Sequence, residues 1–96
     1  MPAKRPYIIL DEHDNVATAI LDLQAGETIR TERGDVTLTQ AIAYGHKFAL
    51  QALQKGDYIV KYGAQIGRAT AAIATGEHVH VHNVEDIVDE VRKNRG

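Results

Sequence analysis

The stretch "LQAGETIR" (residues 23–30) joins an apolar residue, a glycine, an acid and the start of an alternating run. Glycine adopts the positive φ that tight turns require, and the acid that follows it suits a solvated turn. The residues after the acid alternate in polarity, which is typical of a β-strand. The stretch therefore predicts a glycine turn that leads directly into a short strand.

The same pattern occurs twice more, as "LQKGDYIV" (53–60) and "IATGEHVH" (73–80). Each copy reads apolar residue, two spacers, Gly, acid, any residue, apolar residue. We therefore expect turns at Gly26, Gly56 and Gly76, each feeding a strand. The glycines are 30 and 20 residues apart, and this unequal spacing excludes a regular solenoid.

Further strand-like runs surround these turns: "YIIL" (7–10), "VATAIL" (16–21), "DVTLT" (35–39), "KFALQAL" (47–53) and "IGRATAAI" (66–73). The segment "LTQAIAYG" (38–45) is compatible with a short helical turn. Near the end, "NVEDIVDEVRKNR" (83–95) predicts a helix, because Asn83 can cap it, acids fill its first turns and basic residues end it. We expect a mostly β domain of short strands and glycine turns with one C-terminal helix.

Length and composition limit the class of protein. The chain has 96 residues, which predicts one domain: a flexible tail over 1–6, the β domain over 7–83, and a C-terminal helix or tail over 84–96. The net charge is -2 and the eleven Lys and Arg are scattered, so we expect no nucleic acid or membrane partner. The absence of cysteine excludes disulfides, thiolate metal sites and cysteine nucleophiles.

We expect neither a membrane-spanning segment nor a secretory signal. Its apolar runs are far shorter than the ~20 residues needed to cross a bilayer. The start, "MPAKRPY", has no apolar core of a secretory signal. We therefore expect a cytoplasmic domain.

Three of the five histidines lie at alternate positions in "GEHVHVHN" (76–83). In a strand, His78, His80 and His82 would share one face, and Val79 and Val81 would point to the core on the other. The valines are explained by a half-buried strand, but the three imidazoles are not. They fit three alternatives: a metal site, a binding or proton-transfer face shared with another chain, or a solvated strand.

Geometry restricts the metal alternative. Alternate Cα atoms of a strand are ~6.6 Å apart, so the outer pair of these histidines would span ~13 Å, whereas metal–imidazole bonds measure ~2.0–2.1 Å. Two neighbouring histidines can share an ion, but all three cannot while the strand is straight. A further ligand would have to come from another chain or from elsewhere in this one; the candidates are His46, His13, Asp11 and Asp14.

Two other segments carry polar side chains that could bind a ligand or transfer a proton. In "YGHKF" (44–48), Gly45 permits a bend that presents His46 beside Lys47. Neutral imidazole suits proton transfer near pH 7, and Lys suits a carboxylate partner. In "DEHDN" (11–15), three acids surround His13, which fits either a hard-cation site or an ordinary polar loop.

Four segments together resemble the SAF domain of the altronate/galactarate dehydratase family: "DNVATAI" (14–20), "GHKFAL" (45–50), "KYGAQIGRAT" (61–70) and "GEHVHVHN" (76–83). The resemblance covers about residues 7–83, with the motifs in the family's order and spacing, and it implies the SAF-type β-clip fold. One position departs from the family: members often carry a His three residues before the Asp of "DNV", where this chain has Asp11. His13 lies nearby but is shifted by two residues.

In that family the small domain either begins a long dehydratase chain or forms a separate small subunit beside a large catalytic one. The resemblance implies the small subunit of a hydro-lyase of the altronate dehydratase type, inactive alone, acting on a sugar acid with a large catalytic subunit. It also implies a divalent metal, Fe²⁺, held mainly by the large subunit. The alternatives are the small subunit of a sulfolactate sulfo-lyase and a non-catalytic assembly or ligand-binding module. Whether the chain alone forms a homo-oligomer is left open.

The resemblance and the one-faced imidazoles together assign roles to residues. The expected catalytic residues are His46, His78 and His80. The expected substrate-binding residues are Lys47, His82 and Asn83. The expected metal ligands are His78 and His80.

Overall fold

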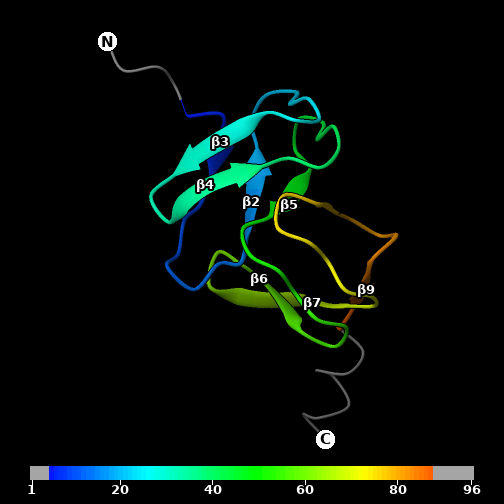
Figure 1. Ribbon diagram of the computed structural model, residues 1–96. Helices are drawn as coiled ribbons and strands as arrows, with labels where there is room; N and C mark the ends of the chain where they lie inside the picture. Colours follow the sequence, from blue (N-terminus) through cyan, green and yellow to red (C-terminus); the bar gives the residue numbers. More distant parts are fainter. Residues whose placement is uncertain (1–4, 88–96) are drawn as a thin grey trace, which may run out of the picture.

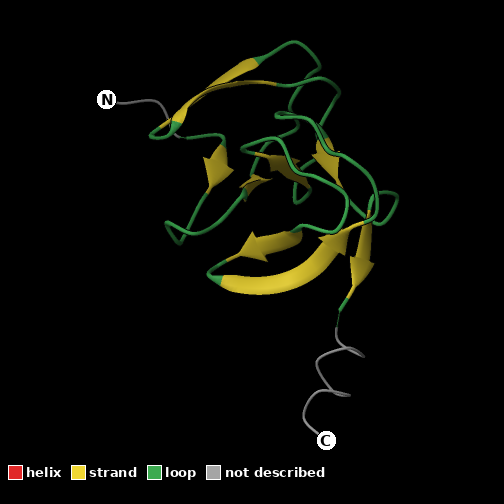
Figure 2. Cartoon of the chain, turned by 60° about the horizontal axis from the view of Figure 1, so that its bottom comes forward, coloured by secondary structure: helices red, strands yellow, loops and turns green. Residues whose placement is uncertain are grey.

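The computed structural model describes residues 5–87 (Figure 1). Within that range the regular secondary structure consists of short β-strands and contains no helix. The strands are β1 (Tyr7–Ile8), β2 (Val16–Ala19), β3 (Thr28–Thr31), β4 (Gly34–Thr37), β5 (Lys47–Ala49), β6 (Tyr58–Lys61), β7 (Ala64–Ala69), β8 (His78–Val79) and β9 (Val84–Asp86). The prediction of a mostly β domain is confirmed. Figure 2 shows how much of the chain between these strands is loop and turn.

The strands form three small antiparallel groups. A four-stranded sheet has the order β1-β2-β5-β8, β3 and β4 form a hairpin, and a three-stranded sheet has the order β6-β7-β9. The β3–β4 hairpin lies at one end of the molecule and β6, β7 and β9 lie at the other (Figure 1). The central strands β2 and β5 lie between the two ends.

Two apolar clusters lie on either side of these central strands. One cluster contains Ala17 and Phe48, together with side chains of the β3–β4 hairpin. The other contains Val16 and Ala49, together with Ile59 of β6. Successive residues of a strand point to opposite faces, so β2 and β5 each contribute to both clusters. β5, the neighbour of β8 in the sheet, is thereby fixed from both sides.

The predicted glycine turns are present, and the structure reveals a fourth copy of the pattern, "IAYGHKF" (42–48). Positive φ is found at the glycine of every copy: Gly26 (87°), Gly45 (83°), Gly56 (94°) and Gly76 (85°). The apolar residues that open the copies pair by isolated bridges, Leu23 with Ile42 and Leu53 with Ile73. The four copies therefore form two similar pairs.

The interpretation of residues 38–45 as a helical turn is wrong. Ile42 exchanges backbone hydrogen bonds with Leu23, at 2.8 and 2.9 Å. A turn centred on Gly45 then leads into β5, and the backbone N–H of His46 donates to the carbonyl of Ala43 at 2.9 Å. This bridge and glycine turn replace the helical turn that local sequence allows.

The helix predicted from Asn83 is also wrong where the structure describes it. Residues 84–86 form β9, which pairs with β7 through Gly67↔Asp86 and Ala69↔Val84. A Cβ atom at Gly67 would lie 2.5 Å from Cγ1 of Val84, so this glycine is what allows the two strands to approach. Tertiary pairing therefore overrides the helical periodicity of the segment. The remainder of the predicted helix, 88–96, and residues 1–4 of the predicted tail lie outside the described residues.

Across residues 5–87, no helix has the length and apolar character needed to cross a membrane.

Candidate functional site

The pairing of β5 with β8 brings two distant histidine segments together. Lys47 pairs with Val79 and Phe48 pairs with His78. Because the strands are antiparallel, His46 comes to lie opposite His80. The ring centroid of His46 lies 4.4 Å from that of His80 and 5.0 Å from that of His78.

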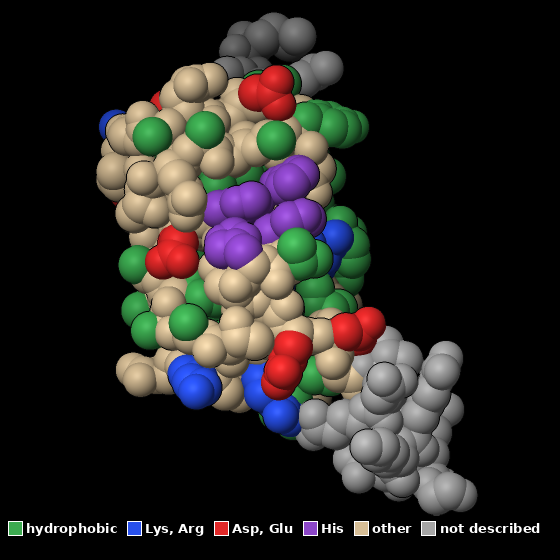
Figure 3. All heavy atoms as spheres, turned by 90° about the vertical axis from the view of Figure 1, so that its right-hand side faces the viewer, with side chains coloured by type: hydrophobic (Ala, Val, Ile, Leu, Met, Phe, Trp, Pro, Cys, Tyr) green, Lys and Arg blue, Asp and Glu red, His purple; other side chains and the backbone are tan. Residues whose placement is uncertain are grey.

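His82 joins the same group, with its ring centroid 5.2 Å from that of His78. We call His46, His78, His80 and His82 the histidine patch. Figure 3 shows these imidazoles as one continuous area on an open face of the molecule.

A direct hydrogen bond links two of the rings. Nδ1 of His46 lies 2.8 Å from Nε2 of His78. Such a bond needs one nitrogen that carries a proton and one with a free lone pair. At most one of the two rings can therefore be doubly protonated while the bond exists. The pair can therefore hold and pass a proton between two segments 32 residues apart in the chain.

The electrostatic surroundings favour neutral rings. Burial, followed by the neighbouring His46, His82, His80 and Lys47, lowers the pKa of His78 below its ordinary value of 6.5. Burial and then His46, Lys47 and His82 lower the pKa of His80. Partial burial penalises the charged form, and adjacent cations add to that penalty. Both rings are consequently available as proton acceptors at neutral pH.

Three members of the patch are arranged as metal ligands could be. One ring nitrogen from each of His46, His78 and His80 lies within 4.8 Å of the others. Two nitrogens on one ion, each bonded at ~2.1 Å, can be no more than ~4.2 Å apart, so small ring movements would bring this set together. Three neutral imidazoles suit a late first-row divalent ion. His82 is not part of this set, which agrees with the geometric argument that the three motif histidines do not converge.

Val81 does not point to the core as predicted. Val79 is fully buried, whereas Val81 is 83% exposed. The reason is that β8 ends at Val79 and the chain turns, with the N–H of Asn83 donating to the carbonyl of His80 at 3.0 Å. The strict alternation expected of a strand therefore stops after His80.

The patch lies between two open grooves. One groove, of about 260 Å³, is lined by Lys47 and His80 together with apolar side chains that include Ile66 and Val84. The other, of about 410 Å³, is lined by His46 and His78 together with Asp22, Leu23, Gln24, Ala41, Ile42 and Ala43. Burial and then the charge of Lys61 lower the pKa of Lys47. A ligand on the patch would thus meet Lys47 and Asp86 among apolar side chains on one side, and Asp22 and Gln24 among apolar side chains on the other.

Asn83, expected to bind substrate, is only 4% exposed. Its Nδ2 donates to the carbonyl of His78 at 2.8 Å and to the carboxylate of Glu77 at 3.3 Å. Its Oδ1 accepts from the N–H of His80 at 2.9 Å. The amide is thus bonded within the chain, and its substrate-binding role stays a prediction.

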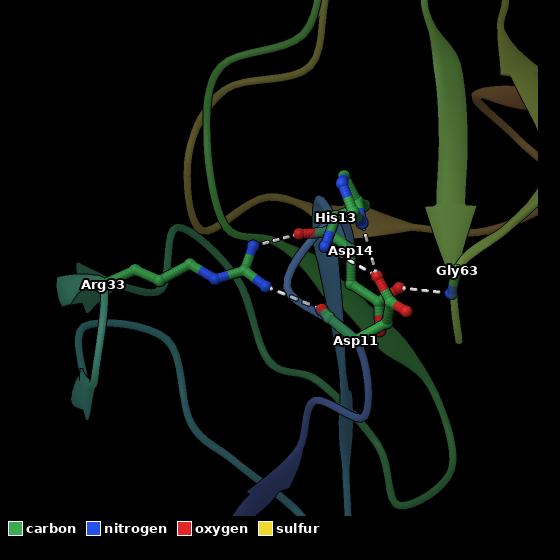
Figure 4. Close-up of polar contacts among 5 residues, drawn as sticks. All are labelled: Asp11, His13, Asp14, Arg33 and Gly63. Atoms are coloured by element: carbon green, nitrogen blue, oxygen red, sulfur yellow. Dashed lines mark hydrogen bonds and ion pairs between the residues drawn. The ribbon is translucent and has the colours of Figure 1, made fainter.

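The acidic segment around His13 forms a separate cluster (Figure 4). Oδ1 of Asp11 accepts from the N–H of His13 at 2.8 Å and lies 2.9 Å from Nδ1 of its ring. The buried Asp14 accepts from the N–H of Gly63 at 2.8 Å. Arg33 donates to the backbone carbonyls of Asp11 and Asp14. The hydrogen bond from the His13 backbone, followed by the His13 side chain, lowers the pKa of Asp11.

These contacts tie the loop to the rest of the fold and give this cluster a structural explanation. None of its acids joins the three-histidine set found among the described residues.

The sequence analysis did not recognise that His46 stands where the other glycine turns have an acid. In the three recognised copies the acid accepts a hydrogen bond from the backbone N–H three residues earlier: Gln24 to Glu27, Gln54 to Asp57 (2.8 Å) and Ala74 to Glu77 (3.0 Å). In the fourth copy His46 occupies the acid's position, and its ring bonds to His78 instead. Aligning 42–48 with the other copies would have revealed the exception.

The fold and the patch define a small, mostly β domain that exposes clustered imidazoles on one face. The family model for the altronate/galactarate dehydratase SAF domain matches residues 5–87, and the chain belongs to this family. The resemblance noted in the sequence is thereby confirmed.

Two kinds of relative are similar to this chain. The altronate dehydratase of Escherichia coli (strain K12) is 44% identical over 89 residues, which cover 93% of this chain and 18% of that protein. The altronate dehydratase of Bacillus subtilis (strain 168) is 38% identical, with 92% and 18% covered. The chain thus spans about a fifth of their length. The (2R)-sulfolactate sulfo-lyase subunit alpha of Chromohalobacter salexigens is 34% identical over 88 residues, covering 82% of this chain and 92% of that subunit.

Proposed function

We propose that this chain is the small subunit of a sugar-acid hydro-lyase of the altronate dehydratase type. It contributes the histidine patch to an active site shared with a larger catalytic subunit. The observation that carries the proposal is the convergence of His46, His78 and His80 on one face, with a hydrogen bond between two of the rings. Similarity to altronate dehydratases over nearly the whole chain supports the substrate class.

The reaction removes water from the sugar acid. A base takes the proton from the carbon next to the carboxylate, and an acid protonates the departing β-hydroxyl. The resulting enol rearranges to a 2-keto-3-deoxy acid. The lowered pKa of His78 and His80 suits them to accept a proton, and His46 can relay it through its bond to His78. Lys47, beside His80 in the groove, suits the substrate carboxylate.

A divalent metal, with Fe²⁺ as the expected ion held mainly by the large subunit, would stabilise the negative charge that develops on the substrate. In this chain His46, His78 and His80 have the donor atoms and spacing to contribute to its binding.

The need for a partner follows from the openness of the site. The patch lies on an open face of the molecule (Figure 3), and its histidines line two open grooves. Proton abstraction and elimination are favoured where water is excluded and charges act in a low dielectric. A second protein surface over the patch would provide that environment. Similarity to a protein named as subunit alpha supports this arrangement.

The test is reconstitution with a large dehydratase subunit, followed by assays on altronate, galactarate and sulfolactate. His78→Ala combined with His80→Ala is expected to lower turnover of the preferred substrate by at least ~100-fold, the lower range for losing general acid–base groups. His13→Ala, which removes an exposed histidine outside the patch, is the matched control and is expected to retain turnover. Unchanged turnover in the double variant would refute the catalytic role.

A second candidate is the small subunit of a sulfolactate sulfo-lyase. The observation that favours it is size, because the match covers 92% of that relative. Turnover of sulfolactate without turnover of either sugar acid would establish it. The third possibility, a non-catalytic assembly module, predicts that patch variants weaken complex formation while the assembled enzyme keeps its full turnover.

A further inference from the structure

The strand that carries His78 has an edge closed by side chains. Among the described strands, β8 is the last of the four-stranded sheet. The His78 N–H donates to Oε1 of Gln40 at 3.1 Å, and its carbonyl accepts from Nδ2 of Asn83 at 2.8 Å. The His80 N–H donates to Oδ1 of Asn83 at 2.9 Å. Two side-chain amides therefore take the place that a neighbouring strand would have.

The same arrangement recurs at Asn15. Its N–H donates to the carbonyl of Val60 at 3.1 Å, and its Oδ1 accepts from the N–H of Val60 at 2.8 Å. Its Nδ2 donates to the carbonyl of Tyr58 at 2.8 Å. Asn83 makes the same three bonds to His80 and His78. Both asparagines are buried, with exposed fractions of 8% and 4%.

The two asparagines hold different stretches of backbone, and Asn83 also donates to the carboxylate of Glu77 at 3.3 Å. Asn15 fixes the backbone of Tyr58 and Val60, outside the patch, whereas Asn83 fixes the backbone of His78 and His80. Since β8 ends at Val79, His80 lies beyond the ladder with β5. Its N–H donates to Oδ1 of Asn83, whereas its carbonyl accepts from the backbone N–H of Asn83. Only the first of these bonds needs the asparagine side chain, and it holds the His80 backbone beyond the end of the ladder.

We propose that Asn83 is the positioning residue of the histidine patch. Its amide holds the backbone of His78 and His80 so that both imidazoles face His46. The effect on turnover rests on the proposed function, while the effect on ring geometry does not. Asn83 acts through the histidines and touches neither substrate nor reacting atoms in this role.

The test compares Asn83→Ala with Asn15→Ala, which removes the same two side-chain bonds to backbone at another buried site. Asn83→Ala additionally removes the bond to Glu77. Nuclear Overhauser contacts between the rings of His46 and His80 are measured in the chain, and kcat and KM are measured in the reconstituted enzyme. Asn83→Ala is expected to abolish the ring contacts and to lower kcat by about 10- to 100-fold, the range for lost support of a functional ligand or a displaced catalytic group. Asn15→Ala is expected to keep both, measured below its own unfolding temperature.

Asn83→Ser guards against a variant that fails to fold, because it keeps a polar group and buries no charge beside Glu77. A single hydroxyl replaces the separate donor and acceptor of the amide, so an intermediate loss of ring contacts is expected. Ring contacts that persist in both Asn83 variants, or that are lost equally in Asn15→Ala, would overturn the inference. Lost ring contacts with unchanged kcat would instead uphold the positioning role and refute the proposed catalytic function.

Discussion

At the scale of single residues, burial and neighbouring cations link the histidine patch to the stability of the fold. The pKa of His78 and that of His80 are both lowered from 6.5 by burial and then by adjacent charges. The unfolded chain therefore binds more protons than the folded chain just below pH 6.5. Stability from this source is complete above pH 6.5 and declines as the pH falls from 6.5 to the lowered pKa values.

We expect the midpoint of urea unfolding to decrease between pH 7.5 and a pH below 6, as the linkage requires. The double variant His78→Ala with His80→Ala is expected to show a shallower decrease over the same interval, because it lacks the two responsible groups. Equal pH dependence in the two proteins would contradict this explanation.

Two glycines with the same backbone angle separate conformational strain from steric overlap. Gly26 and Gly76 have φ of 87° and 85°. A Cβ at Gly26 meets nothing within 4 Å, whereas a Cβ at Gly76 would lie 2.0 Å from the carbonyl oxygen of Thr37. We expect Gly26→Ala to cost about 1–2 kcal/mol of unfolding free energy, from strain alone. Gly76→Ala is expected to cost clearly more in the same urea titration, and equal losses would contradict the overlap.

At the scale of elements, the fourth turn has the imidazole of His46 where the other three turns have an acid that bonds to their own backbone. Glu27, Asp57 and Glu77 each accept a backbone hydrogen bond within their own turn. His46 stands at the same position and reaches His78 instead. This turn therefore departs from the local rule at the point where the patch is built, as functional sites often do.

Restoring the acid should separate stability from function. His46→Asp is expected to gain the turn's hydrogen bond and to lose the bond to His78, each worth about 0.5–1.5 kcal/mol, so the unfolding free energy should change little. The same variant is expected to lose at least ~100-fold in turnover of the reconstituted enzyme. Thermal unfolding and steady-state assays measure the two effects. The reverse change, Asp57→His, is the matched control and should lower stability while leaving turnover intact.

Much of this fold could be predicted from local pattern. The motif identified three of the four glycine turns that share this pattern. Strands β3, β6 and β8 begin shortly after Gly26, Gly56 and Gly76. The helix from Asn83 was wrong because its apolar spacing says nothing of Gly67, which admits β9 beside β7. Val81 was misplaced because a turn held by Asn83 interrupts the alternation.

The sequence could predict which residues belong to the candidate site, but not the contacts among them. The motif at 76–83 and the family resemblance indicated the histidines and Lys47, and His46 was recognised as a possible companion. The contact between His46 and His78 depends on the register of β5 with β8. That register is set by two cores and by long-range pairing, which no single segment encodes.

At the scale of the whole molecule, the position of the patch makes a prediction about assembly. All four of its rings gather on one face, while His13 is exposed in a separate loop. Diethyl pyrocarbonate, which acylates accessible neutral imidazoles, should modify the patch in the lone chain. Binding of the large subunit should protect the patch and leave His13 reactive. Mass spectrometry of the modified peptides measures this, and equal labelling with and without the partner would contradict a shared site.

The closed edge of β8 also determines what kind of recognition this face allows. A strand with free N–H and C=O groups is a template onto which another chain can add a strand, and this is a common route to aggregation. In β8 and just beyond it, the outward backbone groups of His78 and the N–H of His80 are bonded to the side chains of Gln40 and Asn83. The chain is thereby protected from adding strands at the edge beside the histidine patch. A partner must recognise this face through side chains, so its affinity should depend on the imidazoles themselves.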